Sequence, residues 1–149
     1  MAEKVRYIRS LWGTGGPTVM RVTIGASQSI SKGDLIGVDG TNGNCIEVNA
    51  AADDIIGIAL GSVTTAADGS AEMDVIALDS KSVIRLKNYT GSSVDDATSA
   101  MCWGKALYDM RTDGTIDFND TTGGYLIPIA PSVDGYTDCV ISAAKLWNA

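Results

Sequence analysis

Histidine is absent from this 149-residue sequence, and cysteine, proline and phenylalanine are scarce. Without histidine, the chain lacks the usual general base, the usual proton shuttle and the commonest metal ligand. Nucleophilic catalysis would then fall to a pair such as Ser80-Lys81, which no G-x-S-x-G or S-x-x-K frame surrounds. We interpret that pair as part of a solvated turn.

Paired carboxylates are the other catalytic possibility, because two acids flanking one bond can hydrolyse a glycoside. Asp53-Asp54 and Asp95-Asp96 are direct neighbours in the sequence. Neighbouring side chains on a strand point to opposite faces, so neither pair would converge on a substrate. We therefore predict that the protein is not an enzyme and has no catalytic residue.

Metal and cofactor sites have little support in the sequence. Cys45, Cys102 and Cys139 are far apart and form no C-x-x-C pair, so we expect reduced, structural thiols. Four aspartates gather at positions 109, 113, 117 and 120, but they do not follow the D-x-[DN]-x-[DN]-G frame of an EF-hand. We predict no metal and no cofactor, with a cation in this aspartate loop as the alternative.

Long apolar runs are also missing. No stretch of about 18 apolar residues occurs, so no transmembrane helix is expected. The first residues, MAEKVRYIRSLWG, contain no apolar core of a signal peptide. We expect synthesis in a cytoplasm and no membrane partner.

Charge is distributed unevenly along the chain, whose net charge is −7. Residues 1–24 hold four bases and one acid, a net +3, and the other 125 residues hold 7 bases and 17 acids, a net −10. An acidic body repels phosphate, which disfavours nucleic acids and anionic lipids as partners. The basic N-terminal segment would instead be attracted to an acidic protein surface.

Glycine, in contrast, is frequent, with 17 residues, and it recurs in turn dipeptides. These dipeptides are Asp39-Gly40, Asn42-Gly43, Asp68-Gly69, Asp113-Gly114 and Asp134-Gly135. Each supplies the positive φ that a tight hairpin needs, and short β-branched runs lie between them. The pattern predicts a mainly β protein, a small antiparallel β-barrel or sandwich, with at most one short helix.

The expected strands are short. They cover residues 18–24, 35–38, 45–48, 55–60, 72–78, 82–87, 105–109, 115–118, 125–129 and 137–146. In the first of them Met20, Val22 and Ile24 are expected to face the core, and the residues between them the solvent. A helical turn is expected at 93–101, and the small, polar stretch 61–71 is interpreted as an exposed loop.

Residues 4–12, KVRYIRSLW, form a further extended segment in which neither side is cleanly polar. The glycine-rich stretch 13–17 then makes a flexible break. This order predicts an extended N-terminal arm and hinge over residues 1–17, followed by a β-rich domain over 18–149. An ordinary first strand is the alternative for the arm.

The order of features along residues 18–86 resembles the phage head decoration and capsid cement proteins. Members of that family show an alternating strand, a serine followed by a Gly-Asp-hydrophobic step, a hairpin, an Ala-rich acidic stretch and a hydrophobic-Gly-hydrophobic-Ala strand. The matching residues here are Ser29, Gly33-Asp34-Leu35-Ile36, Asp39-Gly40, residues 49–54 and Ile56-Gly57-Ile58-Ala59-Leu60. Residues 72–78 would pair with the last of these strands. The segments 104–110, 113–122, 125–129 and 138–146 are similar to trimeric head-stabilising proteins.

The resemblance implies a homotrimeric structural virion protein on the outside of the mature phage capsid, made in the host cytoplasm. It would bridge subunits of the major capsid protein and stabilise the head, with no nucleic acid or membrane as partner. Within this frame the N-terminal arm could add a strand to a capsid sheet. As a hypothesis we assign capsid binding to Arg6, Tyr7, Ile8, Arg9, Leu11 and Trp12.

Two other virion roles stay open. One is a carbohydrate- or surface-binding β module such as a head fibre, in which Trp12, Trp103 and Trp147 would form an aromatic platform. We expect instead that Trp103 and Trp147 lie in the core. The other is a tail-tube or head–tail joining subunit, which would also assemble from a β-rich chain.

Overall fold

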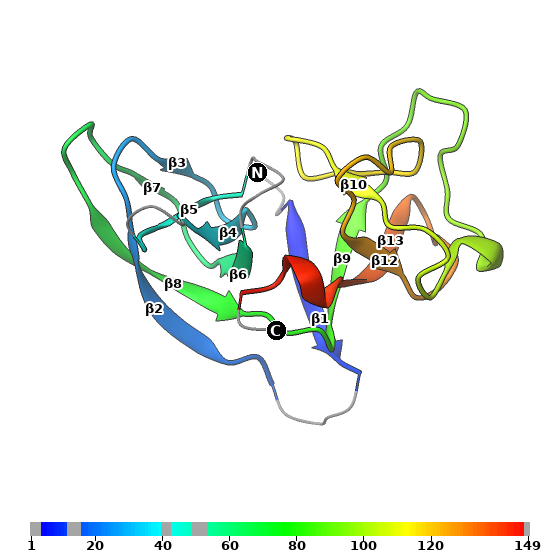
Figure 1. Ribbon diagram of the computed structural model, residues 1–149, viewed down its shortest axis with the longest axis horizontal. Helices are drawn as coiled ribbons and strands as arrows, with labels where there is room; N and C mark the ends of the chain where they lie inside the picture. The colour runs from blue at the N-terminus through cyan, green and yellow to red at the C-terminus, as the bar shows by residue number, and fades with distance from the viewer. Residues whose placement is uncertain (1–3, 12–15, 40–42, 49–53, 148–149) are drawn as a thin grey trace.

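The computed structural model describes residues 4–11, 16–39, 43–48 and 54–147. Figure 1 shows two lobes side by side, with β1 and the C-terminal end of the chain between them. Within the described residues the helical segments are two 3-10 turns, η1 (Ser99–Met101) and η2 (Ala143–Lys145). The protein is mainly β, as its glycine turns and short β-branched runs predict.

The first lobe is a closed barrel with the strand order β2-β5-β4-β6-β8. Its strands are β2 (Val19–Ile24), β4 (Leu35–Val38), β5 (Cys45–Glu47), β6 (Asp54–Ala59) and β8 (Ala71–Ala77). The seam between β2 and β5 is parallel, at Ile24 and Cys45, and the other pairs are antiparallel. Closure removes the free edges of this sheet, which prevents unspecific strand pairing.

The stretch 61–71 is not the plain loop that its composition predicts. Its strand β7 (Val63–Thr64) pairs with β3 (Ser29–Ile30) in a small antiparallel ribbon. The hydroxyl of Thr65 anchors the ribbon, because it donates a buried 2.7 Å hydrogen bond to the Gly25 carbonyl. A buried polar contact of this kind overrides the low β propensity of the small residues around it.

The second lobe is built on a four-stranded antiparallel sheet with the order β1-β9-β13-β12. Its strands are β1 (Val5–Ser10), β9 (Ser82–Lys87), β12 (Leu126–Pro128) and β13 (Tyr136–Ile141). A ribbon of β10 (Asp109–Met110) and β11 (Ile116–Asp117) lies beside it, and its tip is the predicted Asp113-Gly114 turn. The last strand ends at Ile141, earlier than predicted, because the chain turns there toward η2.

The segment predicted to form an arm, residues 1–17, contributes β1 to this sheet. The strand pairs with β9 from Val5 opposite Leu86 to Ser10 opposite Ser82, with a bulge between Tyr7 and Arg9. Val5 is completely buried. In this structure β1 is therefore an edge strand, the alternative that the sequence left open. Trp12 and the start of the glycine hinge lie outside the described residues.

One hydrophobic core spans both lobes. It packs barrel side chains such as Leu35, Ile55 and Ile58 against sheet residues such as Ile84 and Leu86. At the C-terminal end the Trp147 amide donates to the Ile55 carbonyl at 2.9 Å. The two lobes are thus held together by shared apolar burial, which fixes the sheet relative to the barrel.

The Gly-Asp step of the predicted motif forms a second junction between the lobes. Gly33 has a φ of +90°, which glycine adopts without strain, and its carbonyl accepts from the Val5 amide at 3.2 Å. The buried Asp34 carboxylate accepts from the Ser31 amide at 2.8 Å and pairs with the Lys4 ammonium at 2.9 Å. Asp34 thereby ties the start of β1 to the barrel.

Candidate functional site

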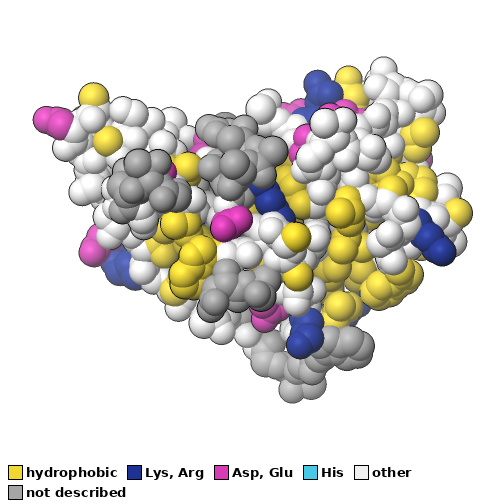
Figure 2. Space-filling model, in the orientation of Figure 1, with side chains coloured by type: hydrophobic (Ala, Val, Ile, Leu, Met, Phe, Trp, Pro, Cys, Tyr) yellow, Lys and Arg dark blue, Asp and Glu magenta, His cyan; other side chains and the backbone are white. Residues whose placement is uncertain are grey.

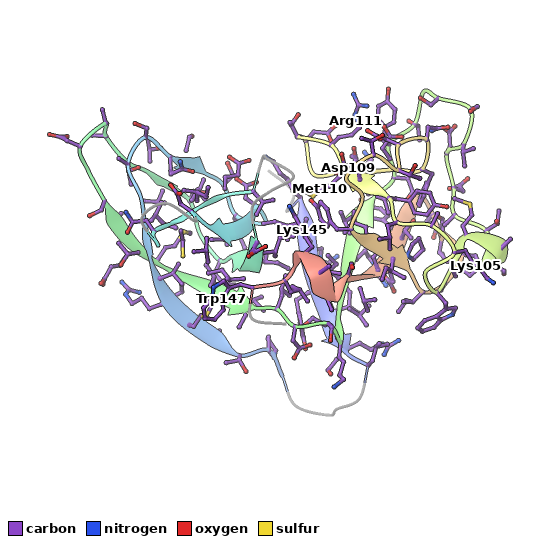
Figure 3. All side chains as sticks on the ribbon, viewed as in Figure 1. Lys105, Asp109, Met110, Arg111, Lys145 and Trp147 are labelled. Atoms are coloured by element: carbon purple, nitrogen blue, oxygen red, sulfur yellow. The ribbon has the colours of Figure 1, made fainter. Side chains whose placement is uncertain are left out.

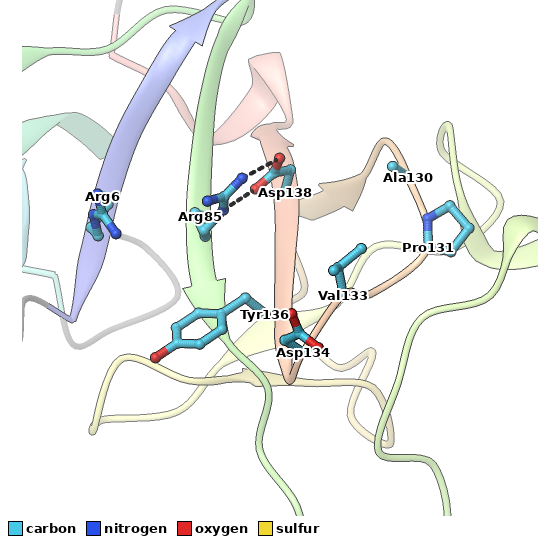
Figure 4. Close-up of a pocket in the computed structure, with 8 residues that line it drawn as sticks. All are labelled: Arg6, Arg85, Ala130, Pro131, Val133, Asp134, Tyr136 and Asp138. Atoms are coloured by element: carbon cyan, nitrogen blue, oxygen red, sulfur yellow. Dashed lines mark hydrogen bonds and ion pairs between the residues drawn. The ribbon is translucent and has the colours of Figure 1, made fainter.

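The outward face of the β1-β9-β13-β12 sheet carries a row of charged side chains, which we call the outer face. Cross-strand partners project from the same side of a sheet, and the register places Arg6 opposite Arg85 and Arg85 opposite Asp138. Arg85 donates to Asp138 twice, from Nε at 2.7 Å and from Nη2 at 3.1 Å (Figure 4). This bidentate pair fixes both side chains and raises the pKa of Arg85.

An open groove of about 430 Å³ adjoins the charged row. Its lining is Arg6, Arg85, Ala130, Pro131, Val133, Asp134, Tyr136 and Asp138 (Figure 4). The predicted Asp134-Gly135 turn builds one wall, with φ values of +52° and +81°, and presents Val133 and Tyr136 on either side of it. These two side chains are 69% and 44% exposed. Exposed apolar and aromatic groups beside fixed charges are typical of a docking surface.

A small apolar cluster continues the outer face. Ile8, Leu11 and Ile127 are half-buried against Val83, Ile129 and Val140. Figure 2 views the molecule from the opposite side, where η2 lies in front of the sheet, and shows hydrophobic side chains over that side of the lobe as well. The cluster gives the charged row an apolar neighbour on the same sheet.

The structure divides the predicted capsid-binding residues between the two faces of β1. Arg6 and Arg9 are exposed, and Ile8 and Leu11 join the outer apolar cluster. Tyr7 instead packs against the core that joins the lobes. Trp12 lies outside the described residues. Sequence reasoning missed the contributions of β9 and β13, since only long-range strand pairing brings them beside β1.

The expectation that Trp103 and Trp147 lie in the core is wrong. Their side chains are 65% and 56% exposed. Trp103 follows η1 in the left-handed region, with a φ of +61°, and its backbone amide donates a 2.8 Å hydrogen bond to the Pro128 carbonyl. The Trp147 amide likewise donates its hydrogen bond to the Ile55 carbonyl, while its indole ring stays largely exposed to solvent (Figure 3). An aromatic residue at a loop or chain end is not forced inward by strand alternation.

Trp147 lines a second groove of about 420 Å³ at the junction of the lobes. The other lining residues are Met20, Ile56, Ala77, Leu78, Asp79, Ser80, Ala143 and Leu146. Ser80 and Lys81 belong to the turn that precedes β9, where Asp79 Oδ1 accepts from the Lys81 amide at 2.8 Å. The turn that we predicted for this pair is thus stabilised by a local carboxylate bond.

Asp95, Asp96 and the aspartate loop make local hydrogen bonds as well, whereas Asp53 of the other acidic pair lies outside the described residues. Asp95 accepts from the Gly91 amide, and Asp96 from the Asn88 side chain at 3.0 Å. Asp113 accepts from the Thr115 hydroxyl at 2.6 Å, which lowers the pKa of Asp113. Across the described ranges, no group of three or more His, Cys, Asp and Glu side chains is arranged to hold a metal ion.

Three cysteines are free and buried. Burial raises the pKa of Cys45 and Cys102, and raises that of Cys139 furthest above the ordinary thiol value. Such thiols are small apolar core groups with little nucleophilic character.

The buried Lys145 ammonium lies 5.2 Å from the centre of the Tyr125 ring. Burial raises the pKa of Tyr125, and it raises the pKa of Asp109 on the neighbouring ribbon (Figure 3). Lys145 also lowers the pKa of Asp109 in part, by charge attraction. Among the described helical segments, none has the length and apolar character to cross a bilayer.

No protein-family model and no curated protein sequence matches the chain. Among solved structures, the chain is similar to the N base of the head fibre gp8.5 of bacteriophage phi29. The sequence identity is 13% and the TM-score is 0.48, over 88% of this chain and 100% of that one.

Proposed function

We propose that the protein is a structural component of a phage virion that binds the exterior of the mature capsid and stabilises the head. The observation that carries the proposal is the position of β1. This strand lies at a sheet edge and presents Arg6, Ile8 and Arg9 on the outer face, where Leu11, directly after the strand, joins them. The resemblance of residues 18–86 to capsid cement proteins supports the same function, with the major capsid protein as partner, a homotrimer as the assembly and no enzymatic activity.

The rigid setting of β1 favours such a role. Lys4 and Val5 attach the strand to the barrel, and β9 holds it along its length. A surface that is ordered before binding loses little conformational entropy on association. If it binds only the expanded lattice, each occupied site adds about 2.7 kcal/mol to lattice stability at a hundredfold excess over Kd.

Sedimentation with heads tests the proposal. The purified protein is mixed with undecorated expanded heads and with unexpanded proheads of its own phage, and both are pelleted. Saturable binding to expanded heads alone is expected, and absence of binding to both by a folded protein would contradict it.

Deletion of residues 1–12 is a poor probe of this surface, because it would remove the buried Val5 along with β1. Ile8→Asp changes the outer cluster and leaves the inner face of the strand intact. We expect Ile8→Asp to weaken binding to expanded heads at least tenfold. Val19→Asp, at an exposed position on β2 in the barrel, is the matched control and should bind normally.

A second candidate function is favoured by the exposure of Trp103 and Trp147. These indoles could serve a surface- or carbohydrate-binding module such as a head fibre, with a sugar ring stacked on Trp147 beside Ser80. Glycan-array binding that Trp147→Ala abolishes, together with no binding to heads, would favour this function over the first. Rings or tubes of the purified protein in electron micrographs would instead favour a tail-tube or head–tail joining subunit.

A further inference from the structure

We propose that the outer face docks an extended, acidic segment of a partner polypeptide, and that the groove beside Tyr136 receives an apolar side chain of that segment. The inference deepens the proposed function by naming the chemistry that the surface recognises. It rests on that function only for the identity of the partner.

Positive charge gathers on this face. Residues two apart on a strand share a face, so Lys87 and Arg85 project together from β9. The bulge in β1 shifts the register, which places Arg6 opposite Arg85 and Arg9 opposite Val83. Because Val83 and Arg85 share a face, both arginines of β1 point outward although they are three residues apart.

Few acids offset these four bases. Asp138 is held by Arg85, and Asp134 lies at the rim of the groove. The face therefore carries an excess of two positive charges on a protein whose net charge is −7. A local potential opposite in sign to the whole molecule steers and orients a partner with complementary charge. A short acidic segment meets that requirement, because the overall charge of −7 repels it less than it repels the denser phosphates of a nucleic acid.

The edge of the sheet explains why the segment would be extended. Within the described residues, no strand pairs with β1 on the side away from β9, where the start of the strand is already held by the hydrogen bond from the Val5 amide to the Gly33 carbonyl. An added strand gains main-chain hydrogen bonds along such an edge, and its alternate side chains reach pockets on the sheet face. A bulge and two arginines discourage pairing with unrelated strands, so a successful partner must compensate the charge.

The groove supplies a site for an anchoring side chain. Val133 and Tyr136 are exposed on its rim, and Pro131 adds a rigid apolar wall. Aromatic and arginine side chains around a concave site are the groups that dominate binding energy in interfaces. An apolar residue within an acidic segment would fill this groove while its neighbours face Arg6 and Lys87.

Titration of the ¹⁵N-labelled full chain with poly-L-glutamate tests the surface directly. We expect amide shifts on β1, on β9 and around the turn at 133–136, none in the barrel, and a loss of binding as salt is raised. Arg6→Glu combined with Arg9→Glu should weaken binding roughly tenfold or more. The control combines Lys32→Glu with Lys105→Glu, which makes the same change in net charge elsewhere and should alter affinity less than about twofold.

Several outcomes would overturn the inference. Absent shifts, shifts centred on the barrel, or equal weakening in both double variants would contradict it. Displacement of poly-L-glutamate by a lower concentration of duplex DNA would show a phosphate-binding surface instead. Thermal melts of both double variants confirm that they remain folded.

Head binding separates this inference from the proposed function. If expanded heads bind the wild type and the Arg6→Glu/Arg9→Glu variant equally, the docking surface is wrong and the proposed function stands. If poly-L-glutamate maps to the outer face but heads do not bind, the docking surface stands and the proposed function is wrong.

Discussion

The ion pair between Lys4 and Asp34 gives the sharpest test of how β1 is attached to the barrel. The Asp34 side chain is only 3% exposed, whereas that of Lys4 is 27% exposed. Oδ1 of Asp34 has Lys4 as its ionic partner and no other hydrogen-bond partner. Replacing Lys4 with methionine would keep an apolar stem of similar length and leave a buried carboxylate oxygen without its partner.

The expected cost follows from that burial. Breaking a buried pair from one side costs about 3–5 kcal/mol, and the partial exposure of Lys4 reduces this to about 2–3 kcal/mol. With a urea m-value of about 2 kcal/mol/M for a domain of this size, the unfolding midpoint should fall by about 1–1.5 M. Lys105→Met, at an exposed lysine before β10, is the control and should leave the midpoint nearly unchanged.

The pH dependence of the same variant adds a second check. The hydrogen bond with Asp34 raises the pKa of Lys4 above the ordinary 10.5. The pair therefore stabilises the folded state fully below that ordinary value, and its contribution is lost as the pH rises through the raised pKa. The difference between wild type and Lys4→Met should be constant from pH 7 to 9 and narrow toward pH 11. Equal midpoints at pH 7 would refute the reasoning.

Further predictions concern the barrel and the core. Gly57→Ala places a Cβ 2.5 Å from the Ile76 carbonyl oxygen and should cost about 1–3 kcal/mol in urea unfolding, whereas Gly61→Ala, with open space around it, should not. Cys139 should resist iodoacetamide in the folded protein and react in urea; rapid labelling without denaturant would contradict its burial. Burial and the nearby Asp34 raise the pKa of Glu47, so its ionisation destabilises the fold at pH 7. Glu47→Gln should raise stability there by a few tenths of a kcal/mol, an advantage that disappears as the pH falls below 4.5, where both folded and unfolded wild type are protonated.

Local chemistry made much of the β architecture predictable. The turns at Asp113-Gly114 and Asp134-Gly135 form where the sequence places them, because the positive φ that they require is a property of glycine and its neighbour. Alternation in β2 identified Met20, Val22 and Ile24 as the inward residues, since strand geometry has a period of two. The family resemblance, rather than local chemistry, predicted that residues 72–78 pair with the strand at 56–60, and β8 does pair with β6.

The partners of each strand were decided by the tertiary structure. The first strand looked like a free arm because neither of its sides is cleanly polar, and the structure gives the reason. One side, with Val5 and Tyr7, packs on the core that joins the lobes, and the other, with Ile8 and Leu11, packs on a small outer cluster. A strand with apolar groups on both sides does not reveal from sequence which surfaces cover it.

The candidate site shows the same division between local and long-range information. The sequence identified Arg6 and Arg9 as part of a basic N-terminal segment within an acidic chain, since charge can be counted without a structure. It did not identify Arg85, Asp138 or Tyr136 as their neighbours, because that neighbourhood depends on pairing β1 with β9 and β9 with β13. The sequence by itself determined the charge, the turns and the strands. Only long-range pairing decided which side chains form one surface, because no local preference encodes the partner of an edge strand.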